Sequence, residues 1–276
     1  MARRIKALLF LLLFLLLLGS GCPRGDEKSG EKSSSGTPLP PELEQMENVL
    51  LEIMQQADLL PLVEQSQSSG EKSREQKPTF DQTTLGEVLN REMQSGEKTE
   101  SKLPADGEQV WNSIKMNIVA LHGQWDKLEP KLREQNIPRE TVAAYEEELD
   151  SLTLAGTSRN EAVLLEAANR QTLYLSRFRM PFSGGQPPLL GELRYYVRSI
   201  VLNSAGGDFA GAQEELGLIR EQLPALTKEL AVEETAGLEI SLENLQRALD
   251  KEDLNLVKIK AAELMDNLVQ SAKQSG

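Results

Sequence analysis

His122 is the first residue to weigh for chemistry, because it is the only histidine in this chain of 276 residues. A neutral imidazole can bind a metal or transfer a proton near neutral pH. Metal sites in helical bundles need several converging ligands, typically Glu-x-x-His pairs on facing helices. Three positions after His122 stands Trp125, which is no ligand. We therefore expect a boundary histidine that hydrogen-bonds a neighbour, and we keep His122 only as a weak ligand-site candidate.

Two pairs of aromatic residues are the other weak ligand-site candidates. Trp111 and Trp125 lie 14 residues apart and share one helical face, an arrangement found in ligand sites and more often in helix cores. Tyr195 and Tyr196 are adjacent and sit between two arginines, so they could line a groove. We favour core packing over ligand binding for the tryptophans. A ligand groove at the tyrosines is given the same low weight as a ligand site at the tryptophans.

The acidic run Glu146-Glu147-Glu148 with Asp150 is the densest cluster of carboxylates in the chain. Successive helical positions point about 100° apart, so these groups fan outward and cannot surround one calcium ion. Nucleophilic catalysis also needs a base beside a serine or cysteine and a third group to orient it. Neither that arrangement nor a phosphate-binding glycine loop is found, so we expect no catalytic residues, no metal site and no cofactor.

Cys22 is the only cysteine, and the segment before it has the three-part pattern of a secretory signal peptide. Arg3, Arg4 and Lys6 form a basic start, residues 7–18 are apolar without interruption, and small residues lead into Cys22. An apolar run of this length covers about 18 Å as a helix, whereas a membrane-spanning helix needs roughly 20 residues. We expect the segment to be cleaved.

Residues 18–22, Leu-Gly-Ser-Gly-Cys, resemble the lipobox of bacterial lipoprotein precursors. The resemblance covers residues 1–22 only, and Gly19 stands where that family prefers leucine or a similar residue. It implies that residues 1–21 are removed and that Cys22 becomes an N-terminus carrying acyl chains such as palmitate. Two or more acyl chains give stable anchoring, so the implied location is extracytoplasmic, on the bacterial cell membrane. The alternative is an ordinary secretory signal cleaved near Gly21.

The overall charge restricts the partners. The chain has 30 basic and 43 acidic residues, and loss of three basic residues with the signal peptide would take the net charge from −13 to −16. Binding a polyanion requires a basic surface that releases counterions, so we expect no nucleic-acid partner. A single cysteine excludes an intramolecular disulfide, and stability must come from a hydrophobic core.

Helical periodicity predicts the fold class. Apolar residues recur every three or four positions from residue 108 onward, and no convincing alternating strand is found. The prediction is an all-α, up-and-down bundle of antiparallel helical hairpins preceded by a disordered tether. The expected segments are a signal peptide at 1–21, a tether at 22–41, an amphipathic helix at 42–62, a low-complexity linker with a possible short helix at 63–107, and a helical-bundle domain at 108–276 with a possible division near 181–188.

Two further features concern the bundle. Its apolar positions overlay at an offset of 93 residues, for example Leu149 on Leu242 and Leu175 on Leu268. A duplication would produce this match, but so would any two helical hairpins with the same spacing. Gly156 is expected to end one helix.

The expected function is binding or scaffolding in the cell envelope by a lipid-anchored helical protein without catalytic activity. Its partners would be the membrane, through Cys22, and an envelope protein of unknown identity. The helix of 42–62 is the expected exchangeable element because linkers flank it. The alternative is capture of a metal ion or small ligand for uptake or sensing.

Overall fold

The computed structural model describes residues 36–69, 79–93, 106–228 and 232–274. These residues are all-α, as the sequence predicted, and the only β-type pairing among them is an isolated bridge between Pro38 and Ser183. The search of these residues found no helix with the length and apolarity to cross a membrane. The predicted signal peptide, Cys22 and most of the predicted tether lie outside the described residues.

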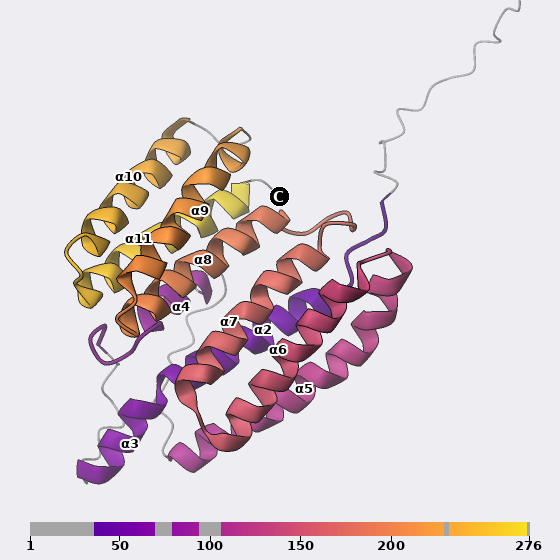
Figure 1. Cartoon of the computed structure of the whole chain (residues 1–276), viewed down its shortest axis with the longest axis horizontal. Helices are drawn as coiled ribbons and strands as arrows, with labels where there is room; N and C mark the ends of the chain where they lie inside the picture. Colours follow the sequence, from indigo (N-terminus) through magenta and orange to yellow (C-terminus); the bar gives the residue numbers. More distant parts are fainter. Residues whose placement is uncertain (1–35, 70–78, 94–105, 229–231, 275–276) are drawn as a thin grey trace, which may run out of the picture. The chain divides into compact units, whose positions relative to one another are not determined.

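A first group of four helices forms a closed ring of contacts, which we call the first bundle (Figure 1). In this ring α2 packs against α5 and α7, and α6 packs against the same two helices. Each helix presents an apolar stripe to the others, as its spacing predicts. The members are α2 (Pro41–Asp58), α5 (Gly107–Glu134), α6 (Arg139–Ser158) and α7 (Glu161–Phe178).

The next four helices repeat this arrangement and form the second bundle. Here α8 packs against α9 and α11, and α10 packs against the same two helices. The members are α8 (Pro188–Ala205), α9 (Phe209–Thr227), α10 (Val232–Leu249) and α11 (Leu254–Gln274). The two bundles meet where α7 packs along α8. This contact is close because a Cβ at Gly191 would lie 2.0 Å from Ser176 Oγ.

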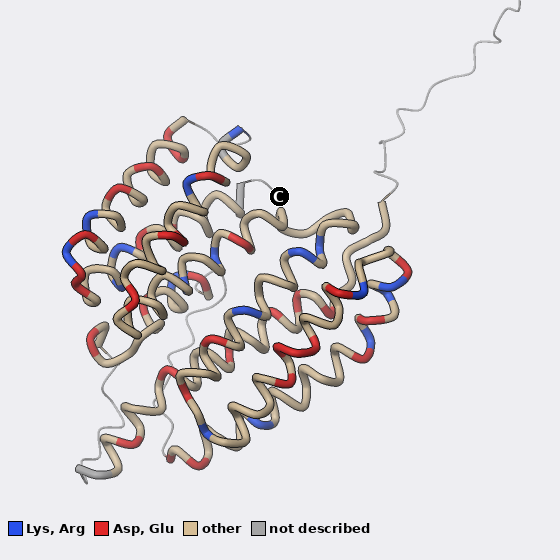
Figure 2. The backbone as a smooth tube through the Cα atoms, in the orientation of Figure 1, with Lys and Arg blue, Asp and Glu red and all other residues tan. Residues whose placement is uncertain are grey.

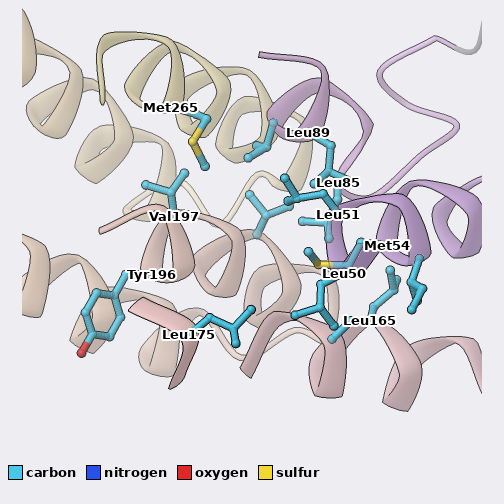
Figure 3. Close-up of a cluster of buried hydrophobic side chains, with 14 of the residues drawn as sticks. Leu50, Leu51, Met54, Leu85, Leu89, Leu165, Leu175, Tyr196, Val197 and Met265 are labelled. Atoms are coloured by element: carbon cyan, nitrogen blue, oxygen red, sulfur yellow. The ribbon is translucent and has the colours of Figure 1, made fainter. Parts of the chain in front are cut away.

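Two short helices lie in the segment between α2 and α5. α3 (Leu60–Ser69) contacts α2 and α5, whereas α4 (Gly86–Met93) packs against α11 of the second bundle and against α2 of the first. Figure 3 shows side chains from both bundles and from the α4 region in one buried cluster. α4 therefore belongs to the hydrophobic core that joins the bundles. The labelled members include Leu50, Leu51, Met54, Leu85, Leu89, Leu165, Leu175, Val197 and Met265.

α2 is a central helix of the first bundle. The side chains of Leu43, Met46 and Leu50 are fully buried, and so is that of Ile53. Burial of one such side chain contributes roughly 1.5–3 kcal/mol, so detaching the whole helix would be very unfavourable. This burial argues against the expectation that α2 exchanges between partners.

The segment before α2 is also fixed to the fold. Leu39 N–H donates to Ser183 O at 3.2 Å, and Ser183 N–H donates to Thr37 O at 2.8 Å. Residues 37–39 were expected to be part of the tether, yet they pair with the loop between α7 and α8. In this loop Gly184 has φ +87° and Gly185 has φ +78°, conformations that glycine adopts without strain.

The prediction that Gly156 ends a helix is wrong. α6 continues to Ser158, and Arg159 then adopts the left-handed conformation with φ 57°. Gly156 is instead a point of close packing, because a Cβ there would lie 2.5 Å from Ile118 Cδ1 on α5. The absence of a side chain at Gly156 lets α5 and α6 approach each other. A glycine can therefore serve close packing inside a helix and need not mark a helix end.

The 93-residue offset extends to the turns of the two bundles. α7 and α11 begin at Glu161 and Leu254, so these two starts differ by 93 residues. Arg159 and Glu252, also 93 apart, are both left-handed. The residues that follow them, Asn160 and Asp253, each accept a backbone N–H from three residues further on. The two turns are thus built in the same way.

Candidate ligand cavity beside the α4 clamp

His122 is half-buried on α5, and its Nε2 lies 2.9 Å from Thr153 Oγ1 on α6. The Thr153 hydroxyl donates its one proton to Leu149 O at 2.9 Å. In this arrangement the Thr153 oxygen accepts from His122 Nε2–H. A search of the described residues found no group of three histidine, cysteine or acidic side chains placed to hold a metal ion. His122 is the boundary residue that the sequence predicted.

The tryptophan candidates are core residues, as favoured. Trp111 and Trp125 are each 4% exposed. The Trp125 ring centroid lies 4.3 Å from that of Tyr145 and 6.0 Å from that of Phe178. Burial raises the pKa of Tyr145, whose hydroxyl donates to Gln171 Oε1 at 3.0 Å. These aromatic side chains are part of the hydrophobic core of the first bundle.

The tyrosine candidates pack on each other on α8, where Tyr196 is buried and Tyr195 is half-buried. Their ring centroids are 5.1 Å apart in an edge-on arrangement, and burial raises the pKa of both hydroxyls. Neither Tyr195 nor Tyr196 lines the cavity described below.

The acidic run on α6 is mostly exposed, with Glu146 and Glu147 facing solvent. Figure 2 shows acidic residues spread over most helices.

A buried polar network fixes the C-terminal end of α4 between the bundles. Arg198 of α8 is 1% exposed and bonds Glu92 of α4 through Nη1, at 2.5 Å to each carboxylate oxygen. Its Nε donates to Asn169 Oδ1 and its Nη2 donates to Thr172 Oγ1, both at 2.7 Å. Removing one partner of such a pair leaves an uncompensated buried charge, which is strongly destabilising.

The N-terminal end of α4 is fixed by a second buried carboxylate. Asp58, at the end of α2, accepts Thr84 N–H at 2.7 Å and Leu85 N–H at 2.9 Å. Burial raises the pKa of Asp58, and these hydrogen bonds oppose that rise. Lys258 of α11 donates to Phe80 O at 3.3 Å, and burial lowers its pKa. We call α4 with these contacts at both ends the α4 clamp, because each end touches both bundles.

A cavity of about 550 Å³ opens beside the C-terminal end of the clamp. Its walls are α2, the last two residues of α4, Leu39, the loop around Gln186, and two arginines. Leu39, Leu51 and Met93 provide apolar surface, and the exposed Glu44 and Glu52 stand on the α2 side. A volume in this range suits a small ligand.

Three buried arginines surround this region, and their pairing differs. Arg179 binds Glu47 at 2.5 Å, and Arg198 binds Glu92. Arg194 is 6% exposed and has no carboxylate within 4.0 Å among the described residues. Its Nη1 donates to Gln186 Oε1 at 2.8 Å, while its buried Nε has no hydrogen-bond partner in the described part of the chain. Native proteins rarely leave such a donor unsatisfied.

Sequence reasoning missed this site and the clamp. Arg194 and Arg198 were noted only as neighbours of the tyrosine pair. Glu92 lies in the segment predicted to be a low-complexity linker with a possible short helix, and that short helix is α4. One signal was present in the sequence. Two arginines four positions apart fall among the apolar residues of α8, although arginines are normally found at exposed positions. The partners of Arg198 lie 26 to 106 positions away in the chain, which spacing within one helix cannot reveal.

Comparison with known proteins found no match: no family model, no curated protein and no solved structure is similar to this chain.

Proposed function

We propose that this protein is a lipid-anchored, extracytoplasmic binding or scaffolding protein of the bacterial cell envelope, without catalytic activity. The observation that carries the anchoring is Cys22 directly after a basic, apolar and small-residue segment. The clamp supports a scaffolding role, since its buried charges bond other helices and hold two bundles together. Such a body can present fixed helical surfaces to an envelope protein.

The anchoring is tested by replacing the thiol. Cys22→Ala should leave the protein unprocessed or release it from the membrane, because no acyl chain can be attached to alanine. Membrane fractionation and metabolic labelling with a palmitate analogue measure both effects, and Ser20→Ala serves as the matched control at a small residue of the same segment. A Cys22→Ala protein that is normally processed and still anchored would contradict lipidation.

The partner is tested separately in native membranes. Cross-linking followed by recovery of the wild-type protein should yield a specific envelope component that is reduced when the protein is released by Cys22→Ala. Recovery of the same component from a strain lacking the protein would show that the capture is unspecific and would contradict scaffolding.

The alternative function is capture of a small ligand or metal ion for uptake or sensing. The cavity beside Arg194 favours the small-ligand form, because it joins a suitable volume to a buried cation without an acidic partner. For a metal ion, elemental analysis of the purified wild-type protein and of His122→Ala provides the test: metal retained by the first and lost from the second would support it.

A further inference from the structure

We propose that the cavity beside Arg194 binds a short peptide or amino acid through its carboxylate. The site rests on the small-ligand alternative above and is independent of lipid anchoring. The ligand's carboxylate binds the Arg194 guanidinium, an apolar side chain fills the space next to Leu39, Leu51 and Met93, and its ammonium group faces the acidic rim.

The first step of the argument is the state of Arg194. A guanidinium offers five N–H donors and keeps its charge at all physiological pH values. In Arg194 the Nη1 group has a neutral amide as its acceptor, and the buried Nε–H has none within the described residues. The terminal Nη1 and Nη2 groups form an edge that binds a carboxylate through two parallel hydrogen bonds. At this edge Gln186 is the acceptor of Nη1, and the described residues supply no carboxylate.

The second step is the contrast with the neighbouring arginines. Arg179 and Arg198 are as deeply buried as Arg194, and each is neutralised by a glutamate. Burial of a charge is tolerated when it is paired. The same region therefore supplies internal acids for two arginines and leaves the third facing a cavity, which is the arrangement expected if an external acid completes the pair.

The third step is access. Gln186, the one recorded acceptor for Arg194, is exposed and belongs to the glycine-containing loop between α7 and α8. Its amide can be displaced by a ligand at little cost because water replaces the lost hydrogen bond. A carboxylate that displaces the Gln186 amide would take its place at Nη1 and would also reach Nη2, so Gln186 is the side chain that the ligand replaces.

The fourth step is the charge of the rim, which selects the ligand. Glu47 and Glu92 are neutralised by arginines, whereas Glu44 and Glu52 are exposed and have no arginine or lysine within 4.0 Å in the described residues. These two acids repel a simple anion such as phosphate and attract an ammonium group. A zwitterion with an apolar side chain would place its carboxylate on Arg194, its ammonium group near Glu44 and Glu52, and its side chain on the apolar surface.

The test measures binding to the full chain purified in detergent from membranes. A panel of Leu-Xaa dipeptides is screened by thermal shift, and the best member is titrated by calorimetry alongside its C-terminal amide and its N-acetyl form. We expect saturable binding at one site, weakened about tenfold or more by amidation and about threefold by acetylation, since the rim acids are exposed. No binding by any dipeptide overturns the proposal, as does equal binding of the amide.

Variants assign the site. Arg194→Met keeps most of the apolar stem and should abolish binding, whereas Arg220→Met, which removes an exposed arginine on α9, should bind normally. Glu44→Gln should weaken the dipeptide about threefold without affecting the N-acetyl form. Inorganic phosphate is titrated as an anion-only probe: phosphate binding that exceeds dipeptide binding shows a simple anion site and overturns the zwitterion.

A stability measurement separates ligand binding from a structural role. Because Arg194 has no internal acid, Arg194→Met without ligand should unfold at the same urea concentration as the wild type or a higher one. Arg198→Met, which orphans Glu92, should unfold at a lower concentration. If both variants lose stability equally, Arg194 is a structural residue and the proposal is wrong. Failure here leaves the Cys22→Ala result unaffected, so the two proposals fail independently.

Discussion

When residues of the first bundle are compared with those 93 positions later in the second bundle, the turns match and the core residues differ. Arg159 and Asn160 are reproduced in conformation and hydrogen bonding by Glu252 and Asp253. The core positions of Tyr145, Tyr174 and Phe178 correspond instead to aliphatic or polar residues of the second bundle, namely Leu238, Asn267 and Ser271. At these positions the helix pair thus has aromatic rings in one bundle and an aliphatic and two polar side chains in the other.

The comparison shows which features determine the architecture. Both bundles share the spacing of apolar residues and a left-handed residue followed by an N-cap. These two features therefore suffice to form the pair of helices joined by this turn, α6 with α7 and α10 with α11. The matching turns support duplication as the interpretation of the offset. The bundles differ most between their first and second helices: α8 and α9 are joined by three residues, whereas the chain between α2 and α5 contains α4. That insertion makes the clamp.

The largest effect should come from breaking the clamp that the two bundles share. Arg198→Ala leaves Glu92 buried without its cation and should reduce the free energy of unfolding by about 3–5 kcal/mol. Urea denaturation followed by circular dichroism measures this loss. The double variant Glu92→Leu with Arg198→Met removes both charges and should regain much of the stability. A double variant as unstable as Arg198→Ala would contradict the assignment of the loss to an unpaired charge.

The next effect compares the cores at equivalent positions. Tyr145→Ala should cost about 3–5 kcal/mol and Leu238→Ala about 2–5 kcal/mol, because each leaves a cavity in its bundle. Both tryptophans are in the first bundle, so their fluorescence reports on that bundle while circular dichroism reports on both. Coupling through the clamp predicts that Leu238→Ala shifts both signals together. A shift in circular dichroism alone would mean that the bundles unfold separately.

A smaller effect should be equal in the two turns. Asn160→Ala and Asp253→Ala each remove an acceptor for a backbone N–H at a helix start, and each should cost about 1 kcal/mol. Thermal unfolding of the two variants checks this equality. Replacement by serine, which can also cap, is the matched control and should restore most of the loss. Unequal costs would show that the turns resemble each other in shape without sharing their energetics.

The smallest effect is a pH dependence to which a glutamate in each bundle contributes. Burial raises the pKa of Glu161 from 4.5 to about 7, with the charges of Asp58 and Glu64 adding to it, and burial raises the pKa of Glu215 to about 7. Between pH 4.5 and 7 the folded protein therefore holds protons that the unfolded chain releases, so stability should fall as the pH rises through this window.

The measurement is urea denaturation at pH 5 and pH 8. The wild type should be more stable at pH 5, and the glutamine variants of Glu161 and Glu215 should each flatten the difference because they no longer titrate. Glu146→Gln, at an exposed position of α6, is the control and should keep the wild-type difference. A wild type that is more stable at pH 8 would reverse the predicted sign.

The fold was largely predictable, because apolar spacing determines which face of each helix is buried. The all-α class and the core roles of Trp111 and Trp125 follow from local pattern, and the structure confirms them. The position of α2 and the pairing of Arg198 with Glu92 were not predictable. They depend on contacts between segments distant in the chain, which no local spacing records, and Gly156 shows that a glycine's role depends on its neighbours in space.

The insertion of α4 has a consequence for dividing this protein into fragments. A cut in the loop between α7 and α8 separates the bundles in the chain, yet α4 stays with the first fragment while its apolar face covers α11 of the second. A fragment of residues 188–276 would expose that surface to water, and exposed apolar patches promote aggregation. It should become soluble when a peptide of residues 79–93 is supplied, so the two halves of the chain are better regarded as complementing pieces than as independent domains.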